Sequence, residues 1–195
     1  MVIPGMRVGF LARTVLLLLA MVSLLAAGGC AGANRVLVAE PFIVPATQEV
    51  LPILPFVGTL VPEEFSTAVF NNCVDILNDN HAQTSIKWFS IIKDDLQDVT
   101  KALPPDHLYV AGELWSYIEN SGCCSTELQV KARVRVVKAG TQEQLFEVEI
   151  PMSSFFEHDR SNLTTERSRL AMRLSREMAA QILAILKSRA PSPSP

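Results

Sequence analysis

The chain has 195 residues, of which 49% are apolar and 19% charged, and its formal net charge is −3. This length fits one domain plus a targeting segment, and such a domain can bury a core of its own. The sequence contains no run of Lys and Arg, so we expect no nucleic-acid partner. With only three His and four Cys available, we also expect no metal site and no cofactor.

The first 29 residues have the features of an export signal. Arg7 and Arg13 give a basic start, and an apolar run over residues 15–27 (VLLLLAMVSLLAA) follows them. This run is shorter than the ~20 residues that cross a bilayer as a helix. Small residues then lead to a cysteine, in the order Ala26-Ala27-Gly28-Gly29-Cys30.

This short motif resembles the lipobox of bacterial lipoproteins, although Ala27 stands where Leu is usual. In that family the cysteine is diacylated through its thiol and becomes the new N-terminus. The resemblance implies a signal peptide over 1–29, lipidation of Cys30 and a lipidated tether over 30–34. Acyl chains on Cys30 would anchor the chain to a membrane, facing the periplasm. Ala31, the residue after the cysteine, favours the outer membrane. The alternatives are an ordinary cleaved signal or an uncleaved anchor, with Cys30 incidental.

Three further cysteines lie in the predicted domain, which spans 35–189. The periplasm permits disulfides, and an odd number of cysteines leaves at least one thiol free or paired between chains. Cys73 lies in an apolar helical pattern, where a buried small hydrophobe is its simplest interpretation. Cys123 and Cys124 lie in a predicted loop, and a bridge from this loop to another part of the molecule is the alternative. All three are candidates for a disulfide.

Residues 35–41 form a first predicted strand, whose two apolar faces are typical of a central strand. A proline-rich apolar insert follows over 43–61. The run from Pro41 to Pro62 has five prolines and one charged residue, Glu49. Proline opposes a regular helix or a central strand. We therefore consider an extended loop packed on its own domain, or a docking surface for another subunit or the bilayer. The candidate contact residues are Phe42, Ile53, Leu54, Phe56 and Val57.

The remaining pattern predicts a helix from Pro62 to about residue 78, a strand at 84–89 and a short helix at 94–103. Three strands follow at 108–119, 127–137 and 145–150. The last two form a hairpin in which Gly140 supplies an unusual backbone angle. The hairpin places Arg133 near Glu147 and Lys131 near Glu149. A long helix over 164–187 precedes a disordered tail at 190–195.

This order predicts an α+β fold with a single mixed, largely antiparallel sheet of about five strands, covered by about three helices. The element order is β-α-β-α-β-β-β-α.

Three short motifs carry a family resemblance. They are the opening strand Val36-Leu37-Val38-Ala39-Glu40-Pro41-Phe42, the strand Tyr109-Val110-Ala111-Gly112-Glu113 and the hairpin from Lys138 to Glu143. With them, residues 35–187 resemble the periplasmic domain shared by the curli-secretion channel lipoprotein, the N-terminal domain of TolB and LpoB. The auxiliary lipoproteins of ABC-type lipid transporters share a similar order. The resemblance implies scaffolding, activation or channel assembly, with no catalytic residues. The insert at 43–61 departs from the pattern.

The sequence offers little for catalysis. It has no G-x-S-x-G motif, and His81, His107 and His158 lie at predicted loops or strand edges. His158 is flanked by acids, but it lies in a predicted polar loop, where we expect exposure and no catalytic pocket. Glu113, beside Trp115, is the one carboxylate for which we consider a cleft position.

We therefore expect a non-enzymatic lipoprotein that acts as a scaffold or accessory subunit of an envelope assembly or secretion complex. Its partner would be another envelope protein or further copies of itself. The alternative is an auxiliary lipoprotein of an ABC-type lipid transport system that binds lipid or an apolar ligand.

Overall fold

The computed structural model describes residues 33–92 and 102–188. Within them the elements are, in chain order, β1 (Arg35–Ala39), β2 (Val50–Ile53), β3 (Val57–Gly58), α2 (Glu63–Asp79), the 3-10 turn η1 (His81–Gln83), β4 (Trp88–Ile91), β5 (Leu108–Ser121), β6 (Ser125–Lys138), β7 (Gln144–Glu157) and α4 (Leu163–Ser188). The signal segment 1–29, Cys30, most of the expected helix at 94–103 and the tail at 190–195 lie outside the described residues.

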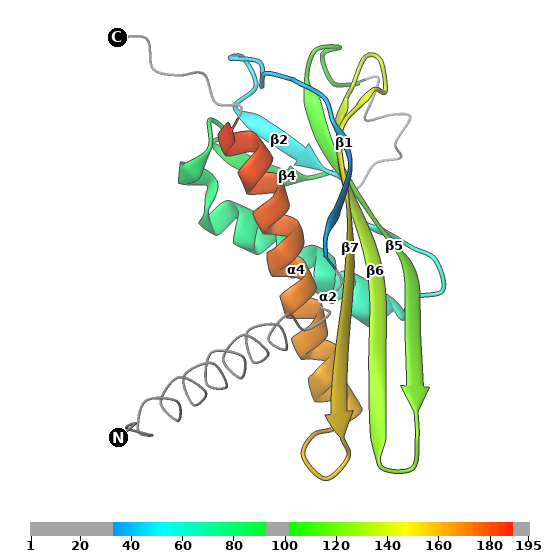
Figure 1. The fold of residues 1–195 in the computed structure, drawn as a ribbon. Helices are drawn as coiled ribbons and strands as arrows, with labels where there is room; N and C mark the ends of the chain where they lie inside the picture. Colours follow the sequence, from blue (N-terminus) through cyan, green and yellow to red (C-terminus); the bar gives the residue numbers. More distant parts are fainter. Residues whose placement is uncertain (1–32, 93–101, 189–195) are drawn as a thin grey trace, which may run out of the picture. The chain divides into compact units, whose positions relative to one another are not determined.

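The strands form one mixed sheet in the order β1-β7-β6-β5-β2-β4, with β3 also paired to β5. The pairs β1–β7, β7–β6 and β6–β5 are antiparallel, whereas β2 and β3 run parallel to their neighbours. Figure 1 shows the described helices α2 and α4 on the same side of the sheet. The α+β class and the mixed sheet are confirmed. The counts differ, because the sheet has seven strands rather than about five and the described residues hold two α-helices rather than about three.

Of the three long strands β5, β6 and β7, β6 alternates most regularly between buried apolar residues and less buried polar ones. In β6 the side chains toward the helices are fully buried, and they are those of Leu128, Val130, Ala132, Val134 and Val136.

Strand β7 continues past Pro151, where a proline would ordinarily interrupt a sheet. The carbonyl of Leu145 accepts from Glu40 N–H at 2.8 Å, so odd positions of β7 turn their amides toward β1. Pro151 lies beyond Glu149, the last β1-paired residue, and its missing N–H therefore leaves no bond unmade.

Two strands, β2 and β3, lie inside the segment that the sequence analysis expected to be an irregular insert. Pro52 argues against a strand in this segment, because it has no N–H to donate to a neighbouring strand. Leu54 N–H donates to the carbonyl of Val110 at 2.9 Å. Two residues earlier, where Pro52 cannot donate, the carbonyl of Leu108 accepts from Nε2 of Gln48 at 2.6 Å instead. A buried side-chain amide thus replaces the missing backbone donor, and β2 fits between β5 and β4.

Strand β1 lies at an edge of the sheet and not at its centre. Its residues Val36 and Leu37 are exposed, and a bulge interrupts its pairing with β7 between Val36 and Val38. The expectation of a doubly covered central strand is therefore wrong. Apolar residues on both faces are typical of a strand that is covered on both sides, but the pattern does not show whether the cover is present. The described residues leave β1 partly uncovered.

The turn between β6 and β7 also differs from its expected form. The positive backbone angle belongs to Gln142, with φ 57°, and not to Gly140. A Cβ at Gly140 would lie 2.6 Å from Cβ of Pro105, and Gly140 N–H donates to the Pro105 carbonyl at 2.9 Å. Gly140 is thus needed for the close approach of another loop and not for the angle of its own turn.

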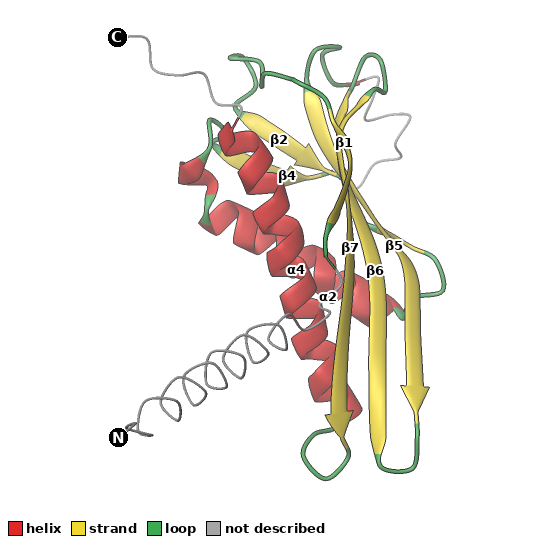
Figure 2. Cartoon of the chain, in the orientation of Figure 1, coloured by secondary structure: helices red, strands yellow, loops and turns green. Residues whose placement is uncertain are grey.

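The core lies between the sheet and the two helices. Figure 2 shows the described helices beside the strands that they cover. Helix α2 begins at Glu63, directly after Pro62, as expected. At the contact between the helices, the buried hydroxyl of Ser175 lies within hydrogen-bond distance of two carbonyls, that of Ala171 at 2.7 Å and that of Val69 at 2.9 Å, between which it shares its one proton. This arrangement satisfies a polar group that would otherwise destabilise the core.

Candidate interaction surfaces

The proline-rich segment has a buried half and an exposed half. Four of the five residues expected to contact a partner are buried in their own domain, and they are Phe42, Ile53, Leu54 and Phe56. The expectation that they form a docking surface is therefore wrong, and the interpretation of a segment packed on its own domain holds for them. The physical reason is that β2 joins the sheet and buries Ile53, while Phe42, Leu54 and Phe56, which lie outside β2 and β3, pack into the hydrophobic clusters of the domain. Val57 is the exception, because it is 63% exposed.

The exposed half of the segment contains Val57, Leu60 and Ile43. Leu60 stands out, since its side chain is 93% exposed and its backbone has φ 57°. A leucine gains nothing from this backbone region, which favours Gly and Asn. An exposed apolar side chain on an unfavourable backbone angle is a feature more typical of contact sites than of a packed loop. The sequence held no signal for it, because composition does not report a backbone angle.

A second exposed apolar surface lies at the edge of the sheet formed by β4, and we call it the β4 edge. It consists of Trp88 on β4 with Val50 on β2, while Ile91, three residues further along β4, is exposed on the opposite face of the sheet. Val50 and Trp88 are register partners, so their side chains are neighbours on the same face. Trp88 is 54% exposed. Beside it, Lys87 and Glu49 form an exposed ion pair at 2.6 Å.

A third exposed apolar surface lies at the opposite edge, and we call it the β1 edge. It consists of Val36 and Leu37. Within the described residues, β1 pairs with β7 alone. Strands at sheet edges carry unpaired backbone groups and can pair with another chain. The two edges therefore present two chemically similar but structurally different apolar surfaces.

The outward face of the long strands is charged, and its cations are paired. Arg135 contacts Glu113 at 3.0 Å, and Arg133 contacts Glu147 at 3.2 Å. The Arg133–Glu147 pair agrees with the sequence analysis, although Arg133 stands directly opposite Glu149 in the register. Lys131 stands opposite Pro151 instead of Glu149, and its ammonium lies 5.1 Å from the centre of the Trp115 ring. Glu113 thus serves in a cross-strand ion pair and not in a cleft.

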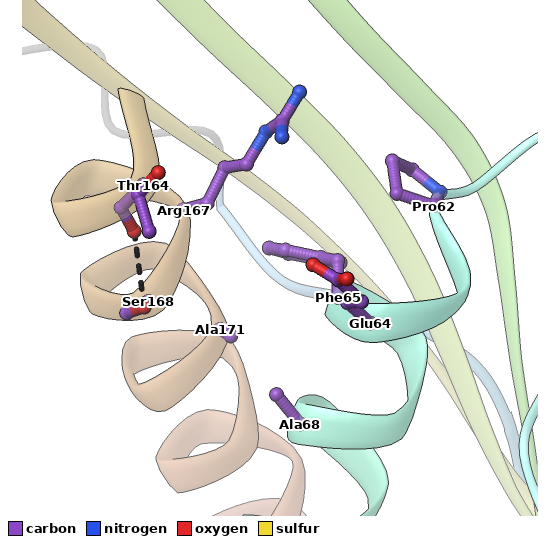
Figure 3. A pocket seen from close by; sticks show the side chains of 8 residues that line it. All are labelled: Pro62, Glu64, Phe65, Ala68, Thr164, Arg167, Ser168 and Ala171. Atoms are coloured by element: carbon purple, nitrogen blue, oxygen red, sulfur yellow. Dashed lines mark hydrogen bonds between the residues drawn. The ribbon is translucent and has the colours of Figure 1, made fainter. Parts of the chain in front are cut away.

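A small pocket lies between the first turns of α2 and α4, with a volume of about 100 Å³. Figure 3 shows its lining, in which Phe65 and Ala68 of α2 face Arg167 and Ala171 of α4. Pockets that take drug-sized ligands have volumes of roughly 300–1,000 Å³. This pocket is too small for an acyl chain, and the core beside it is packed with buried side chains.

The polar groups next to this pocket bind one another. The Arg167 guanidinium donates to both oxygens of Glu119, at 3.1 and 2.8 Å, and its Nε donates to Tyr117 Oη at 3.2 Å. The hydrogen bonds to Glu119 hold the pKa of Arg167 above its ordinary value, and burial raises the pKa of Tyr117. The network joins α4 to β5. We interpret it as a structural contact between the helix and the strand, because its charged groups are hydrogen-bonded to one another.

The three cysteines of the domain are free thiols. Cys73 is fully buried in α2, and burial raises its pKa to about 12. Cys123 and Cys124 are exposed in the turn between β5 and β6, with their sulfur atoms 3.1 Å apart. Cys73 therefore belongs to the core, as its pattern predicted. The structure shows no bridge from the turn to Cys73.

The candidate acid–base residues do not form a group. Nε2 of His158 lies 2.8 Å from the Thr126 hydroxyl, and its ring contacts Phe156. Nδ1 of His81 lies 2.6 Å from the carbonyl of Asn78. No group of three or more His, Cys, Asp and Glu residues suited to a metal ion occurs in the described ranges. None of the described helices is long and apolar enough to cross a membrane.

Comparisons with known proteins relate this chain to others by fold. No family model matches the sequence, and no curated protein matches it. The structure is similar to the PelC dodecamer from Paraburkholderia phytofirmans, with a TM-score of 0.53 at 11% identity, over 82% of this chain and 99% of that one. It also matches a lipoprotein from Neisseria meningitidis, with a TM-score of 0.43 at 10% identity, over 69% of this chain and 98% of that one.

A further match is a DUF330 protein from Xanthomonas campestris, with a TM-score of 0.47 at 10% identity, over 78% of this chain and 92% of that one. At identities this low, structural likeness shows a shared fold. The chain therefore has the fold seen in PelC. The resemblance to the curli-secretion, TolB and LpoB domains stays a prediction.

Proposed function

We propose that this chain is a lipid-anchored lipoprotein of the bacterial cell envelope, and that it serves as a non-catalytic subunit in an assembly of several copies of itself. Acyl chains on Cys30 hold its N-terminus at a membrane, with the outer membrane favoured by Ala31. The domain faces the periplasm. Its role is positional, because lipid fixes one end while the surfaces of the sheet bind neighbouring subunits.

The observation that carries this proposal is the pair of exposed edges. Trp88 and Val50 lie at the β4 edge, and Val36 and Leu37 lie at the β1 edge, at opposite ends of one sheet. A contact between two different surfaces of identical subunits is head-to-tail, and it closes into a ring when the rotation between subunits permits. The PelC protein with the same fold was determined as a dodecamer. That likeness supports an assembly of copies.

The non-catalytic part of the proposal is supported by the state of the polar side chains. The carboxylates of Glu113, Glu119 and Glu147 each pair with an arginine. A catalytic acid or base needs a site where its proton can reach a substrate. The pocket between α2 and α4 is small, and its guanidinium is already bound to Glu119.

The first experiment is mass spectrometry of the membrane-extracted protein, compared with the Cys30→Ala variant. We expect an N-terminal peptide that begins at an acylated Cys30 in the wild type and is absent from the variant. Native mass measurement of the same extract should give a multiple of the subunit mass. A mature chain without acyl mass would refute the anchor, and a monomer at all accessible concentrations would refute the assembly.

A further inference from the structure

The turn between β5 and β6 places two thiols side by side. Cys123 and Cys124 are consecutive, exposed and 3.1 Å apart at their sulfur atoms. The turn lies beside an open hollow of about 600 Å³, whose wall includes Phe155 and His158. Both thiols are thus accessible to a soluble reagent or protein.

The backbone that carries these thiols is held from both sides. Gly122 N–H donates to the carbonyl of Ser125 at 2.8 Å, which closes the turn. His158 N–H donates to the carbonyl of Cys124 at 2.9 Å, which joins the turn to the end of β7. At the base of the hairpin, the hydroxyls of Ser121 and Thr126 lie 3.0 Å apart. These bonds keep the two sulfurs near one another rather than near a distant partner.

The other cysteines are poor partners for this pair. Cys73 is fully buried in α2, and its pKa of about 12 leaves almost no thiolate at neutral pH. The thiolate is the form that attacks a disulfide. Cys30 lies outside the described residues, and the proposed function assigns its thiol to an acyl chain. The nearest partner of each exposed cysteine is therefore its neighbour in the sequence.

We propose that Cys123 and Cys124 form a disulfide with one another, making the hairpin turn a redox-sensitive site. The inference goes beyond the proposed function, and rests on it only for export to an oxidising compartment. The oxidant is a protein disulfide of that compartment. The Cys123 thiolate attacks one sulfur of the oxidant, and one oxidant thiolate leaves. The Cys124 thiolate then attacks Cys123 sulfur and releases the second oxidant thiolate. The two thiols lose two protons and two electrons, and the oxidant becomes a dithiol.

Adjacency makes such a bond easy to reduce. Consecutive Cα atoms across a trans peptide are about 3.8 Å apart, whereas disulfides usually join Cα atoms about 4.4–6.8 Å apart. A bond made outside the usual range is strained, and strained, exposed disulfides are the labile ones. The turn would therefore exchange between oxidised and reduced forms more readily than a structural disulfide.

The test is differential alkylation of the full chain, expressed with its own signal and blocked with a maleimide under denaturing conditions before reduction. Trypsin releases residues 102–131 as one peptide containing both Cys123 and Cys124, while Cys73 falls in peptide 36–87. We expect no label on peptide 102–131, a mass two hydrogens below the dithiol, and two labels after reduction. Peptide 36–87 should be labelled without reduction. In the matched variant Cys124→Ser, Cys123 should take the label directly.

Two results would overturn the proposal. One is full labelling of both cysteines before reduction in exported protein, and the other is a bridge from peptide 102–131 to a different peptide. If the signal is retained and the chain is not exported, the proposed function fails separately. The extracted chain is then treated with oxidised glutathione, for which we expect the intramolecular bond. Two glutathione adducts without that bond would count against the inference.

Discussion

Single residues decide whether this sheet can form, and Gln48 is the clearest case. Its side chain is 2% exposed, donates to the Leu108 carbonyl at 2.6 Å and accepts from Leu108 N–H at 2.8 Å. In Gln48→Ala both backbone groups of Leu108 lose their partners next to Pro52, which cannot replace them. A buried unsatisfied group costs about 1–3 kcal/mol. We expect urea unfolding of the domain to show a loss of about 2–4 kcal/mol.

The matched control for this substitution is Gln83→Ala. Gln83 is an exposed amide that donates to Asn80 Oδ1 at 2.9 Å. Its loss should change the unfolding free energy by no more than about 0.5 kcal/mol, as for most surface positions. Equal effects of the two substitutions would mean that Gln48 does not replace the donor that Pro52 lacks.

Glu166 gives the domain a predictable dependence on acid. The Ser161 hydroxyl donates to its carboxylate at 2.7 Å, and with Arg169 this hydrogen bond holds the pKa of Glu166 below its ordinary 4.5. A carboxyl whose folded-state pKa is lowered stabilises the fold above the unfolded-state pKa. That stabilisation is lost as the pH falls through the folded-state value. Wild type should therefore exceed Glu166→Gln in stability at neutral pH, with a gap that closes in acid.

The measurement is urea unfolding of both proteins at a series of pH values from about 7 down to about 3. Glu143→Gln is the control, because the Glu143 carboxylate makes no ion pair with a described residue. A gap between wild type and Glu166→Gln that stayed constant over this range would contradict the role given to the carboxylate.

At the scale of elements, sequence periodicity predicted the helices and strands that bury one face and expose the other. Strand β6 and helices α2 and α4 each bury one face, and a period of 2 or 3.6 makes that visible. The pattern failed where burial and backbone pairing are decided by distant residues. Pro52 argued against β2, and only the position of Gln48 beside Leu108 removes the objection. The register of β7 differs from the predicted one, because an irregularity between Val136 and Val137 leaves Leu145 without a partner and shifts the pairs that follow.

The candidate surfaces were predicted less well than the fold, for a related reason. In the segment 43–61 apolar side chains are so frequent that composition does not separate those facing the core from those facing solvent. Ile53 became buried when β2 paired with β5, and Val57 stayed exposed on β3. The sequence places Trp88 in a strand but does not show that this strand, β4, lies at an edge of the sheet. The order of strands depends on contacts between residues that are distant in the sequence.

Gly112 holds strand β5 against the segment that contains Phe56. A Cβ at Gly112 would overlap the Phe56 ring, which in turn packs edge-on against Phe70 with ring centres 5.1 Å apart. In Gly112→Ala the ring must move, and overpacking of this kind costs about 1–3 kcal/mol. Unfolding measurements on Gly112→Ala, Phe56→Leu and the double variant form a cycle. The double variant should be more stable than the sum of the single losses predicts.

Additive losses in this cycle would show that Gly112 is required for another reason. In that case the Phe56 ring would not be the reason why a glycine stands in the Tyr109–Glu113 motif. If the double variant is more stable than the two single losses predict, the glycine in that motif is explained by the space that one aromatic ring occupies.

At the scale of the whole molecule, the two edges of the sheet would be matched in an assembly. A head-to-tail ring requires that every subunit present both surfaces, so a change at one edge weakens every contact in the ring. The β4 edge is the better target, because Trp88 is large, exposed and next to Val50 in the register. Tryptophan is enriched among the residues that dominate binding energy at interfaces.

The variant Trp88→Asp tests this arrangement directly. It replaces an apolar contact with a charge that would be buried on assembly, and we expect a loss of about 2 kcal/mol or more per contact, which is about a thirtyfold or larger rise in the dissociation constant. Native mass measurement and light scattering on detergent-extracted protein report the change. The control is Phe155→Asp, since Phe155 is also exposed, at 66%, but lies on β7 beyond the residues that pair with β1. Equal dissociation by both variants would point to a general effect of charge, and an intact assembly in Trp88→Asp would remove the β4 edge from the interface.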